Sequence, residues 1–256
     1  MTPTVLTFLA VVFFLTAIVS VVTGGTSLIT VPVMMQFGID SHISVATNMF
    51  ALIFLSLGGS LPFLKSKSLP RRRLPALIGL TLVASTLGAL LLLVVPTKAM
   101  PLVIATAMLV VAVFSLINPE AGLSPAVDRP SRRLVTAGYF ATFVFGIYGG
   151  FFSGGYVILL TAVYVAFFSM TFVEAVAITK VLNFFSSLVA AAVFAGQGLI
   201  DWRLASILSI TAFAGGLLGA VLAQRTSNRW LRRIFLTAVI ALAVKTLLYD
   251  VTWMPL

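Results

Sequence analysis

The sequence GGFFSGGY at residues 149–156 separates two apolar runs, and TGGTS at residues 23–27 does the same near the start of the chain. Glycines tolerate backbone conformations that other residues avoid, so a helix inside a membrane can stop and restart at them. The apolar runs that follow, 26–37 and 155–168, are shorter than the ~20 residues that a spanning helix needs. The sequence therefore predicts two broken helices.

The composition is that of a membrane protein. The 256 residues are 61% hydrophobic and only 9% charged, with a mean hydropathy of +1.18, whereas soluble chains carry about 25% charged residues. A membrane β-barrel would instead show alternating segments of about 10 residues. We therefore predict an all-α integral membrane protein whose longer apolar runs are 4–22, 41–64, 74–95, 99–118, 134–151, 171–195, 203–222 and 232–249.

Several other classes of protein are disfavoured by the residue inventory. The chain has no cysteine, which excludes disulfides, iron–sulfur clusters and thiolate zinc sites. The net charge of +10 is better explained by loops that face anionic lipid than by nucleic-acid binding. The first residues, MTPTVLTF, lack a basic region and a small-residue cleavage site, so we expect the first helix to be retained.

The middle of the chain divides it into two similar halves. Residues 119–133, PEAGLSPAVDRPSRR, form the predicted linker between repeats 1–118 and 134–256. HISVATN at 42–48 aligns with EAVAITK at 174–180, and the order of elements is the same in both halves. The sequence therefore predicts an internal duplication.

The loop charges predict how the two repeats are oriented. Loops 65–73, 119–133 and 223–233 are rich in Lys and Arg, whereas 96–101 and 196–203 are poor in them. The positive-inside rule places the rich loops in the cytoplasm, so loop 65–73 and its counterpart 196–203 lie on opposite faces. We therefore predict two inverted-topology repeats, each a re-entrant broken hairpin followed by three transmembrane helices. The alternative is a kinked span in place of each hairpin, with parallel repeats; it leaves the arginines of 225–233 outside.

The restarts of the broken helices are candidate anion sites. Inverted repeats with broken helices are typical of secondary transporters that bind substrate near the bilayer midplane. A helix start exposes unpaired N–H groups and a partial positive charge, which favours an anion. The alternative is that the glycines only permit close helix crossing. The candidate binding residues at the restarts are Gly24, Gly25, Thr26, Ser27, Ser153, Gly154 and Gly155.

A lysine lies in the middle of an apolar run. In EAVAITKVLNFF, residues 174–185, Lys180 would cost about 3 kcal/mol in lipid, so it should face protein or water. Asn183 follows on the same helix face. With Thr179, and with Thr47 and Asn48 of the matching helix, these residues predict a small polar cavity that holds one cation and suits a compact anion. The alternative is a structural lysine that is neutralised by Glu174 or by a carbonyl group.

His42 is the only histidine and stands beside Asp40 at the start of the run 41–64. A histidine titrates near neutral pH, so His42 is a candidate for proton coupling. The alternative role, which we favour at this point, is that of an interfacial helix cap, with Glu174 behaving likewise in the second half. No metal site is predicted.

Two long blocks resemble a known family. TGGTSLITVPVMMQFGIDSHISVATNMFALIF at 23–54 and GFFSGGYVILLTAVYVAFFSMTFVEAVAITKVLNFFSSLVAAAVFAGQGLIDWRLA at 150–205 are similar to blocks of the sulfite exporter TauE/SafE family, also described as four-toluene-sulfonate uptake permeases. The resemblance implies a multi-pass carrier of the cytoplasmic (inner) membrane, with proton or sodium coupling. It also implies sulfite, a sulfonate such as sulfoacetate, or thiosulfate as the substrate.

The predicted function is therefore secondary transport of a small sulfur-containing anion. The alternatives are an anion channel and an intramembrane enzyme. An enzyme needs a nucleophile, an acid–base pair or a metal cluster, and the chain has one histidine, no cysteine and six scattered carboxylates. We expect no enzymatic activity and no cofactor. The sequence leaves the direction of transport, the coupling ion and the oligomeric state open.

Overall fold

The computed structural model describes residues 1–64, 73–117 and 130–223, and these residues form helices joined by short turns. The predicted all-α architecture is confirmed. The predicted helix 232–249, most of the linker 119–133 and most of the basic loops 65–73 and 223–233 lie outside the described residues. The helices are α1 Pro3–Thr23, α2 Thr26–Gln36, α3 Ser41–Leu64, α4 Leu74–Val94, η1 Thr97–Ala99, α5 Met100–Ile117, α6 Arg132–Phe151, α7 Tyr156–Phe168, α8 Phe172–Gly196 and α9 Trp202–Ala223.

Helix length divides these elements into two groups. Within the described residues, six helices are long and apolar enough to cross a membrane, namely α1, α3, α4, α6, α8 and α9. The helices α2 and α7 have 11 and 13 residues and are too short. Both predicted interruptions are therefore confirmed, and each separates a long helix from a short one.

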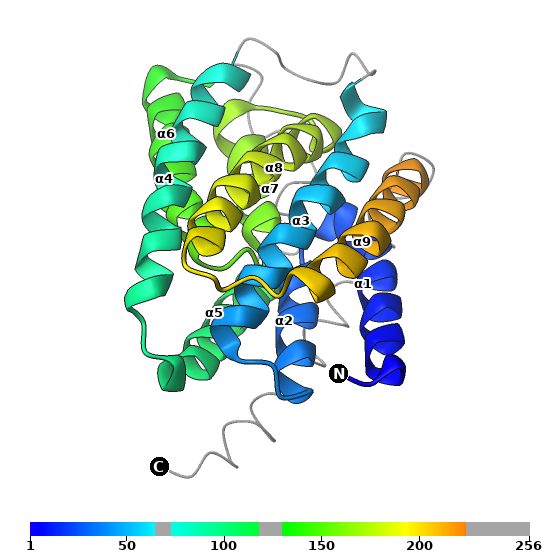
Figure 1. Cartoon of the computed structure of the whole chain (residues 1–256). Coiled ribbons are helices and arrows are strands. Elements are labelled where there is room, and N and C mark those ends of the chain that lie inside the picture. The colour runs from blue at the N-terminus through cyan, green and yellow to red at the C-terminus, as the bar shows by residue number, and fades with distance from the viewer. Residues whose placement is uncertain (65–72, 118–129, 224–256) are drawn as a thin grey trace.

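The short helices turn back beside the long helices that precede them. In Figure 1 the N-terminus and the α2–α3 turn lie at the lower end of the molecule, whereas the start of α6 and the α7–α8 turn lie at the upper end. The helix α3 runs upward from blue to cyan, and α8 runs downward from yellow-green to yellow. The central helices of the two halves thus have opposite directions.

The packing of the long helices is matched between the halves. The helix α1 packs against α9, α6 packs against α4, and α3 packs against α8 between them. Glycines allow both outer pairs to approach closely: a Cβ on Gly88 would lie 1.9 Å from the carbonyl oxygen of Ile147, and one on Gly219 would lie 2.3 Å from that of Ile18. Small residues let helix backbones meet in this way in membranes.

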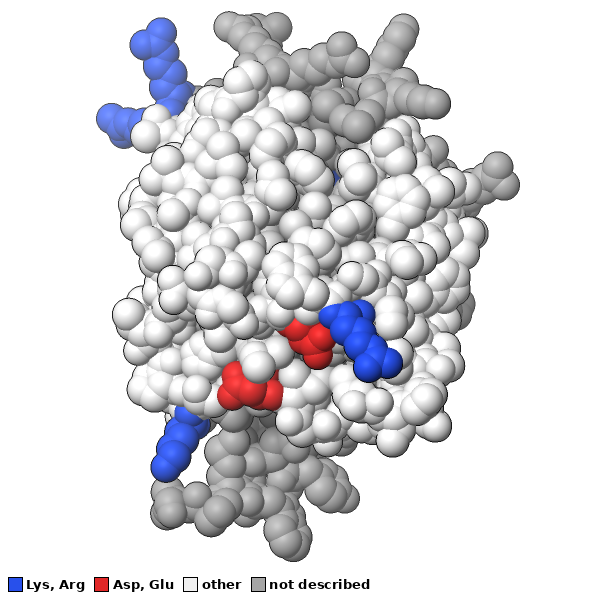
Figure 2. Space-filling view, in the orientation of Figure 1, with Lys and Arg blue, Asp and Glu red and all other residues white. Residues whose placement is uncertain are grey.

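The outside of this bundle is largely apolar. Most of the face in Figure 2 is uncharged, and the few Lys, Arg, Asp and Glu side chains are at its upper left and in its lower half. Large apolar side chains are exposed along the long helices, for example Phe140 at 70% and Ile210 at 71%. Buried polar side chains include Thr26, Ser27 and Ser153, which lie where the broken helices restart.

Candidate functional site

Each broken helix restarts at a glycine inside the protein. Gly25 precedes α2 and Gly155 precedes α7, and a glycine offers no side chain to cap the first turn. Gly24 and Gly155 adopt left-handed backbone conformations, with φ of 64° and 82°, which favour glycine. The helix starts therefore present N–H groups and a partial positive charge without a side-chain cap from the preceding residue.

The two breaks touch each other. A Cβ placed on Gly24 would lie 2.3 Å from the Cβ of Val157 in α7, and a Cβ placed on Gly154 would lie 2.6 Å from Cδ2 of Leu28 in α2. Each break is thus packed against the short helix of the other half. This reciprocal contact brings the starts of α2 and α7 together at the centre of the molecule.

Asn48 connects α3 to the first break. Its Nδ2 donates a hydrogen bond of 2.8 Å to Ser27 Oγ, and its Oδ1 accepts one of 2.7 Å from Thr30 Oγ1. All three side chains are buried. The amide of Asn48 therefore fixes the first turn of α2 beside α3.

Asn183 plays the corresponding role for the second break. Its Oδ1 accepts a hydrogen bond of 3.1 Å from Ser153 Oγ, and its Nδ2 donates one of 2.6 Å to Ser56 Oγ on α3. The sequence alignment of 42–48 with 174–180 sets Asn48 against Lys180, but the contacts match Asn48 with Asn183. Asn183 also joins the two halves, since Ser56 belongs to the first.

Lys180 is buried at the end of α1. Its Nζ donates a hydrogen bond of 3.0 Å to the carbonyl oxygen of Ser20, which also accepts one of 2.7 Å from Gly24 N. Only 1% of Lys180 is exposed. The hydroxyl of Ser20 is hydrogen-bonded to that of Thr26, the first residue of α2. The ammonium group therefore lies next to the first break, where the C-terminal end of α1 favours a cation.

No carboxylate in the described part of the chain pairs with Lys180. The described carboxylates are Asp40, Glu174 and Asp201, and each accepts hydrogen bonds from the start of a helix. The alternative of neutralisation by Glu174 is therefore wrong, because that side chain forms a capping box with Thr171. The alternative of a carbonyl partner describes the observed contact, but a carbonyl supplies only a partial charge.

Two predicted residues lie outside this network. Thr47 is buried, and its Oγ1 accepts a hydrogen bond of 3.2 Å from the backbone of Asp201, in the α8–α9 turn. Thr179 Oγ1 donates to Val176 O of its own helix. Both threonines precede network residues by one position, and a step of one residue turns a helical side chain to another face.

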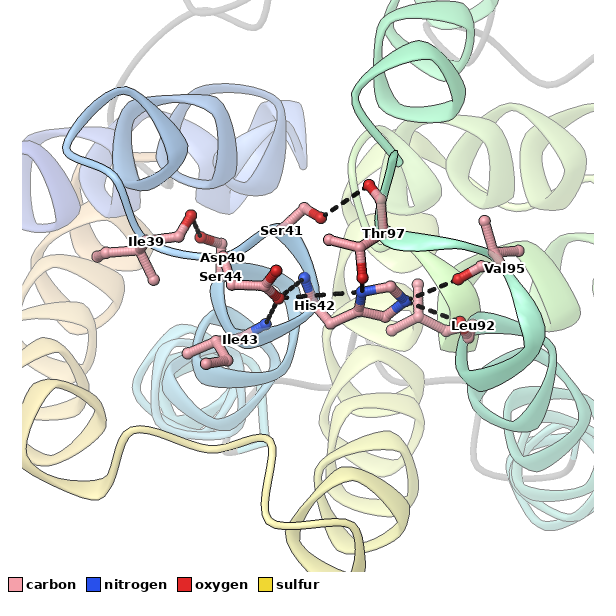
Figure 3. A network of polar contacts seen from close by, with 9 residues as sticks. All are labelled: Ile39, Asp40, Ser41, His42, Ile43, Ser44, Leu92, Val95 and Thr97. Atoms are coloured by element: carbon pink, nitrogen blue, oxygen red, sulfur yellow. Dashed lines mark hydrogen bonds and ion pairs between the residues drawn. The ribbon is translucent and has the colours of Figure 1, made fainter. Parts of the chain in front are cut away.

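His42 belongs to a separate network at the start of α3 (Figure 3). Its Nε2 lies 3.0 Å from Val95 O and 3.3 Å from Leu92 O, and its Nδ1 lies 3.1 Å from Thr97 Oγ1. The residue that caps α3 is Asp40, whose Oδ1 accepts from the backbone N–H of His42. From sequence we favoured His42 as the cap of its own helix, but its ring instead binds the carbonyls of Leu92, in the last turn of α4, and of Val95, which follows α4.

The sequence analysis missed several members of the central network. Ser20 and Thr30 complete the first break, and the Tyr148 hydroxyl donates to the carbonyl of Gly154 at the second. Ser85 on α4, which the sequence analysis also missed, donates to Ser186 on α8 at 2.7 Å in a separate buried contact. A weak signal exists for Thr30, which follows Thr26 at the helical spacing of four residues.

Comparison with known proteins gives the family. Residues 9–246 match the family described as "Sulfite exporter TauE/SafE". The chain belongs to this family. The resemblance stated from the sequence is thereby confirmed, and so is a multi-pass protein of the inner membrane of the TauE/SafE transporter type.

Individual TauE/SafE-type relatives are similar over nearly their whole length. A "Probable membrane transporter protein" of Haemophilus influenzae is 25% identical over 248 residues, which are 96% of each chain. "Probable membrane transporter protein ORF9" of Sinorhizobium sp is 26% identical over 245 residues, covering 94% of this chain and 92% of the relative. YfcA of Escherichia coli K12, also named a probable membrane transporter protein, is 24% identical, covering 94% and 90%. No solved structure matches the chain significantly.

Proposed function

We propose that this protein is a secondary transporter that moves a small sulfur-containing anion across the cytoplasmic membrane. The substrate class comprises sulfite, sulfonates such as sulfoacetate, and thiosulfate. The observation that carries the proposal is the buried Lys180 next to the first break, which in turn packs against the second break through Gly24 and Gly154. Together these groups form a positive centre without a carboxylate partner among the described residues.

The central groups match the needs of an oxyanion that has lost its water. Such a solute needs hydrogen-bond donors and positive charge around its oxygens. The helix starts supply N–H groups, Asn48 and Asn183 supply amide donors, and Lys180 supplies the cation. Each amide now bonds to hydroxyls, and these bonds can be exchanged for bonds to the substrate when it enters.

The opposite directions of α3 and α8 support inverted repeats (Figure 1). In such carriers the two halves rock about a central site and open it to each face in turn. The packing of α1 against α9 and of α6 against α4 fits this scheme. If α1 corresponds to α6 and α4 to α9, the two contacts are equivalent in the two halves. The substrate site then lies on the axis between the halves, where the breaks touch.

A flux assay in proteoliposomes tests the function. The candidates are sulfite, thiosulfate and sulfoacetate, with sulfate and taurine for comparison. We expect saturable uptake of at least one of the first three, accelerated by a proton or sodium gradient. Uptake that rises linearly with concentration and ignores both gradients would identify a channel, and failure to move any of the three would refute the proposal.

Surface labelling tests the inverted arrangement. Because the chain has no cysteine, single cysteines can be introduced at Gly198, in the exposed α8–α9 turn, and at Ser131, which precedes α6. We expect an impermeant maleimide to label Gly198→Cys from the outside of intact cells and Ser131→Cys only after lysis. Lys98→Cys in η1 serves as a second outside position. Labelling of Gly198→Cys and Ser131→Cys from the same side would contradict inverted repeats.

A further inference from the structure

The His42 network fastens the start of α3 to the end of α4. Figure 3 shows the His42 ring pointing from α3 toward the carbonyls of Leu92 and Val95, with Thr97 at its other nitrogen. Ser41 Oγ adds a contact of 3.5 Å to Thr97 O. We call these contacts of Ser41 and His42 the His42 clamp. The clamp joins α3, which carries Asn48, to the α4–α5 turn.

Both protonation states of the ring fit this clamp. In the neutral ring, Nε2–H donates to the α4 carbonyls and Nδ1 accepts from the Thr97 hydroxyl. In the protonated ring, Nδ1–H donates, and the Thr97 hydroxyl turns to accept. The charged ring then also lies at the negative end of α4 and 3.9 Å from Asp40 Oδ1. Protonation thus adds charge interactions to contacts that already exist.

Few other charged groups surround the ring. Among the described residues of the elements that it contacts, Asp40 precedes α3 and the exposed Lys98 lies in η1. The sequences of α4 and α5 contain no charged residue. His42 is 8% exposed, so the ring lies at the edge of the buried region, within reach of protons from water.

We propose that His42 binds the coupling proton of transport, and that the protonated ring holds α3 against the end of α4 and so closes this end of the carrier. The proposal rests on the proposed transport function. Asn48 follows His42 by six residues, about 9 Å along the helix. Movement of α3 away from α4 would therefore carry Asn48 with it and alter the central site. Loss of the proton to water weakens the clamp and permits that movement.

The main test is His42→Gln, with sulfite and sulfoacetate as probes in proteoliposomes. Glutamine can donate to the α4 carbonyls as the neutral ring does, but it binds no proton. Histidine changes charge between about pH 5 and pH 8, so we expect the wild-type rate to differ several-fold between those limits. In His42→Gln this ratio is expected to fall to about one, and the acceleration by a proton gradient is expected to vanish.

Two variants of residues that cap helices provide a second test of the proposal. Asn is as good a helix cap as Asp, so Asp40→Asn keeps the start of α3 and removes only the charge near the ring. We expect it to reduce the difference between the transport rates at about pH 5 and pH 8, because the protonated ring loses the nearby negative charge. Asp201→Asn makes the same change at the start of α9, and its rates at about pH 5 and pH 8 are expected to equal those of wild type.

The outcomes separate the inference from the function on which it rests. Transport by wild type together with an unchanged pH response in His42→Gln would overturn the proton site and leave the transporter intact. Equal changes of the transport rates at about pH 5 and pH 8 in Asp40→Asn and Asp201→Asn would also overturn it. If wild type moves none of the sulfur anions, the proposed function itself fails. Thermal unfolding of each variant verifies that it is folded.

Discussion

Lys180→Met is expected to weaken binding of the sulfur anion by about 10- to 150-fold while the protein stays folded. A hydrogen bond to a charged group contributes about 1.5–3 kcal/mol, and each 1.4 kcal/mol is a factor of about ten. Methionine has a similar length and fills the space of the lysine stem. Titration of purified protein with sulfite or sulfoacetate measures the dissociation constant.

The fold is expected to tolerate this change for two reasons. The partner of Lys180 is a carbonyl and not a carboxylate, so its removal leaves no buried counter-charge unpaired among the described residues. The carbonyl of Ser20 keeps its hydrogen bond from Gly24 N, so it is not left without a partner. Thermal unfolding in detergent measures the stability of both proteins.

Lys98→Met is the matched control, because it removes the same charge from an exposed position in η1. Its anion affinity is expected to equal that of wild type. If Lys180→Met binds and moves the anion as wild type does, Lys180 is a structural residue and the proposed site is wrong.

Gly24→Ala is expected to destabilise the protein much more than Gly38→Ala, although both glycines have positive φ, 64° and 79°. A Cβ on Gly24 meets Val157 at 2.3 Å, whereas a Cβ on Gly38 meets nothing within 4 Å. Left-handed backbone costs a non-glycine residue about 1–2 kcal/mol, and overpacking adds about 1–3 kcal/mol. We therefore expect a loss of about 1–2 kcal/mol for Gly38→Ala and about 2–5 kcal/mol for Gly24→Ala.

Denaturant unfolding in mixed micelles, or the yield of monodisperse protein, measures this difference. The variant Gly154→Ala provides a reciprocal test, because its new methyl group would meet Leu28 at 2.6 Å and Phe152 at 2.4 Å. Equal stability of Gly24→Ala and Gly38→Ala would show that the two breaks do not press on each other.

The helix positions were predictable because they depend on local features. Apolar runs and paired glycines set the starts and ends of α1, α2, α6 and α7, and these signals need no knowledge of packing. Gly24 and Gly154 correctly predicted where the helices are interrupted. The sequence did not predict that each interruption would pack against the short helix of the other half. That contact depends on the relative placement of segments about 130 residues apart, as the sequence numbers show.

The site was predicted in part, for reasons that concern side-chain direction. Lys180, Asn48 and Asn183 are buried as expected, but the partner of Lys180 is a backbone carbonyl, which every residue possesses, so no side chain marks it in advance. Thr47 and Thr179 were included because they adjoin Asn48 and Lys180. Adjacent residues on a helix face different neighbours, and these two threonines bond elsewhere. His42 was predicted as a cap because its own helix start was considered and the end of α4 was not.

The packing contact between the two breaks affects the order in which the chain can assemble. The glycine at each break packs against a residue of the other half: Val157 lies beside Gly24, and Leu28 lies beside Gly154. The ribosome synthesises the first half before the second. The segment around Gly24 therefore has no contact with Val157 until α7 has been made. The contact between the two breaks is therefore completed only after α7 has been synthesised.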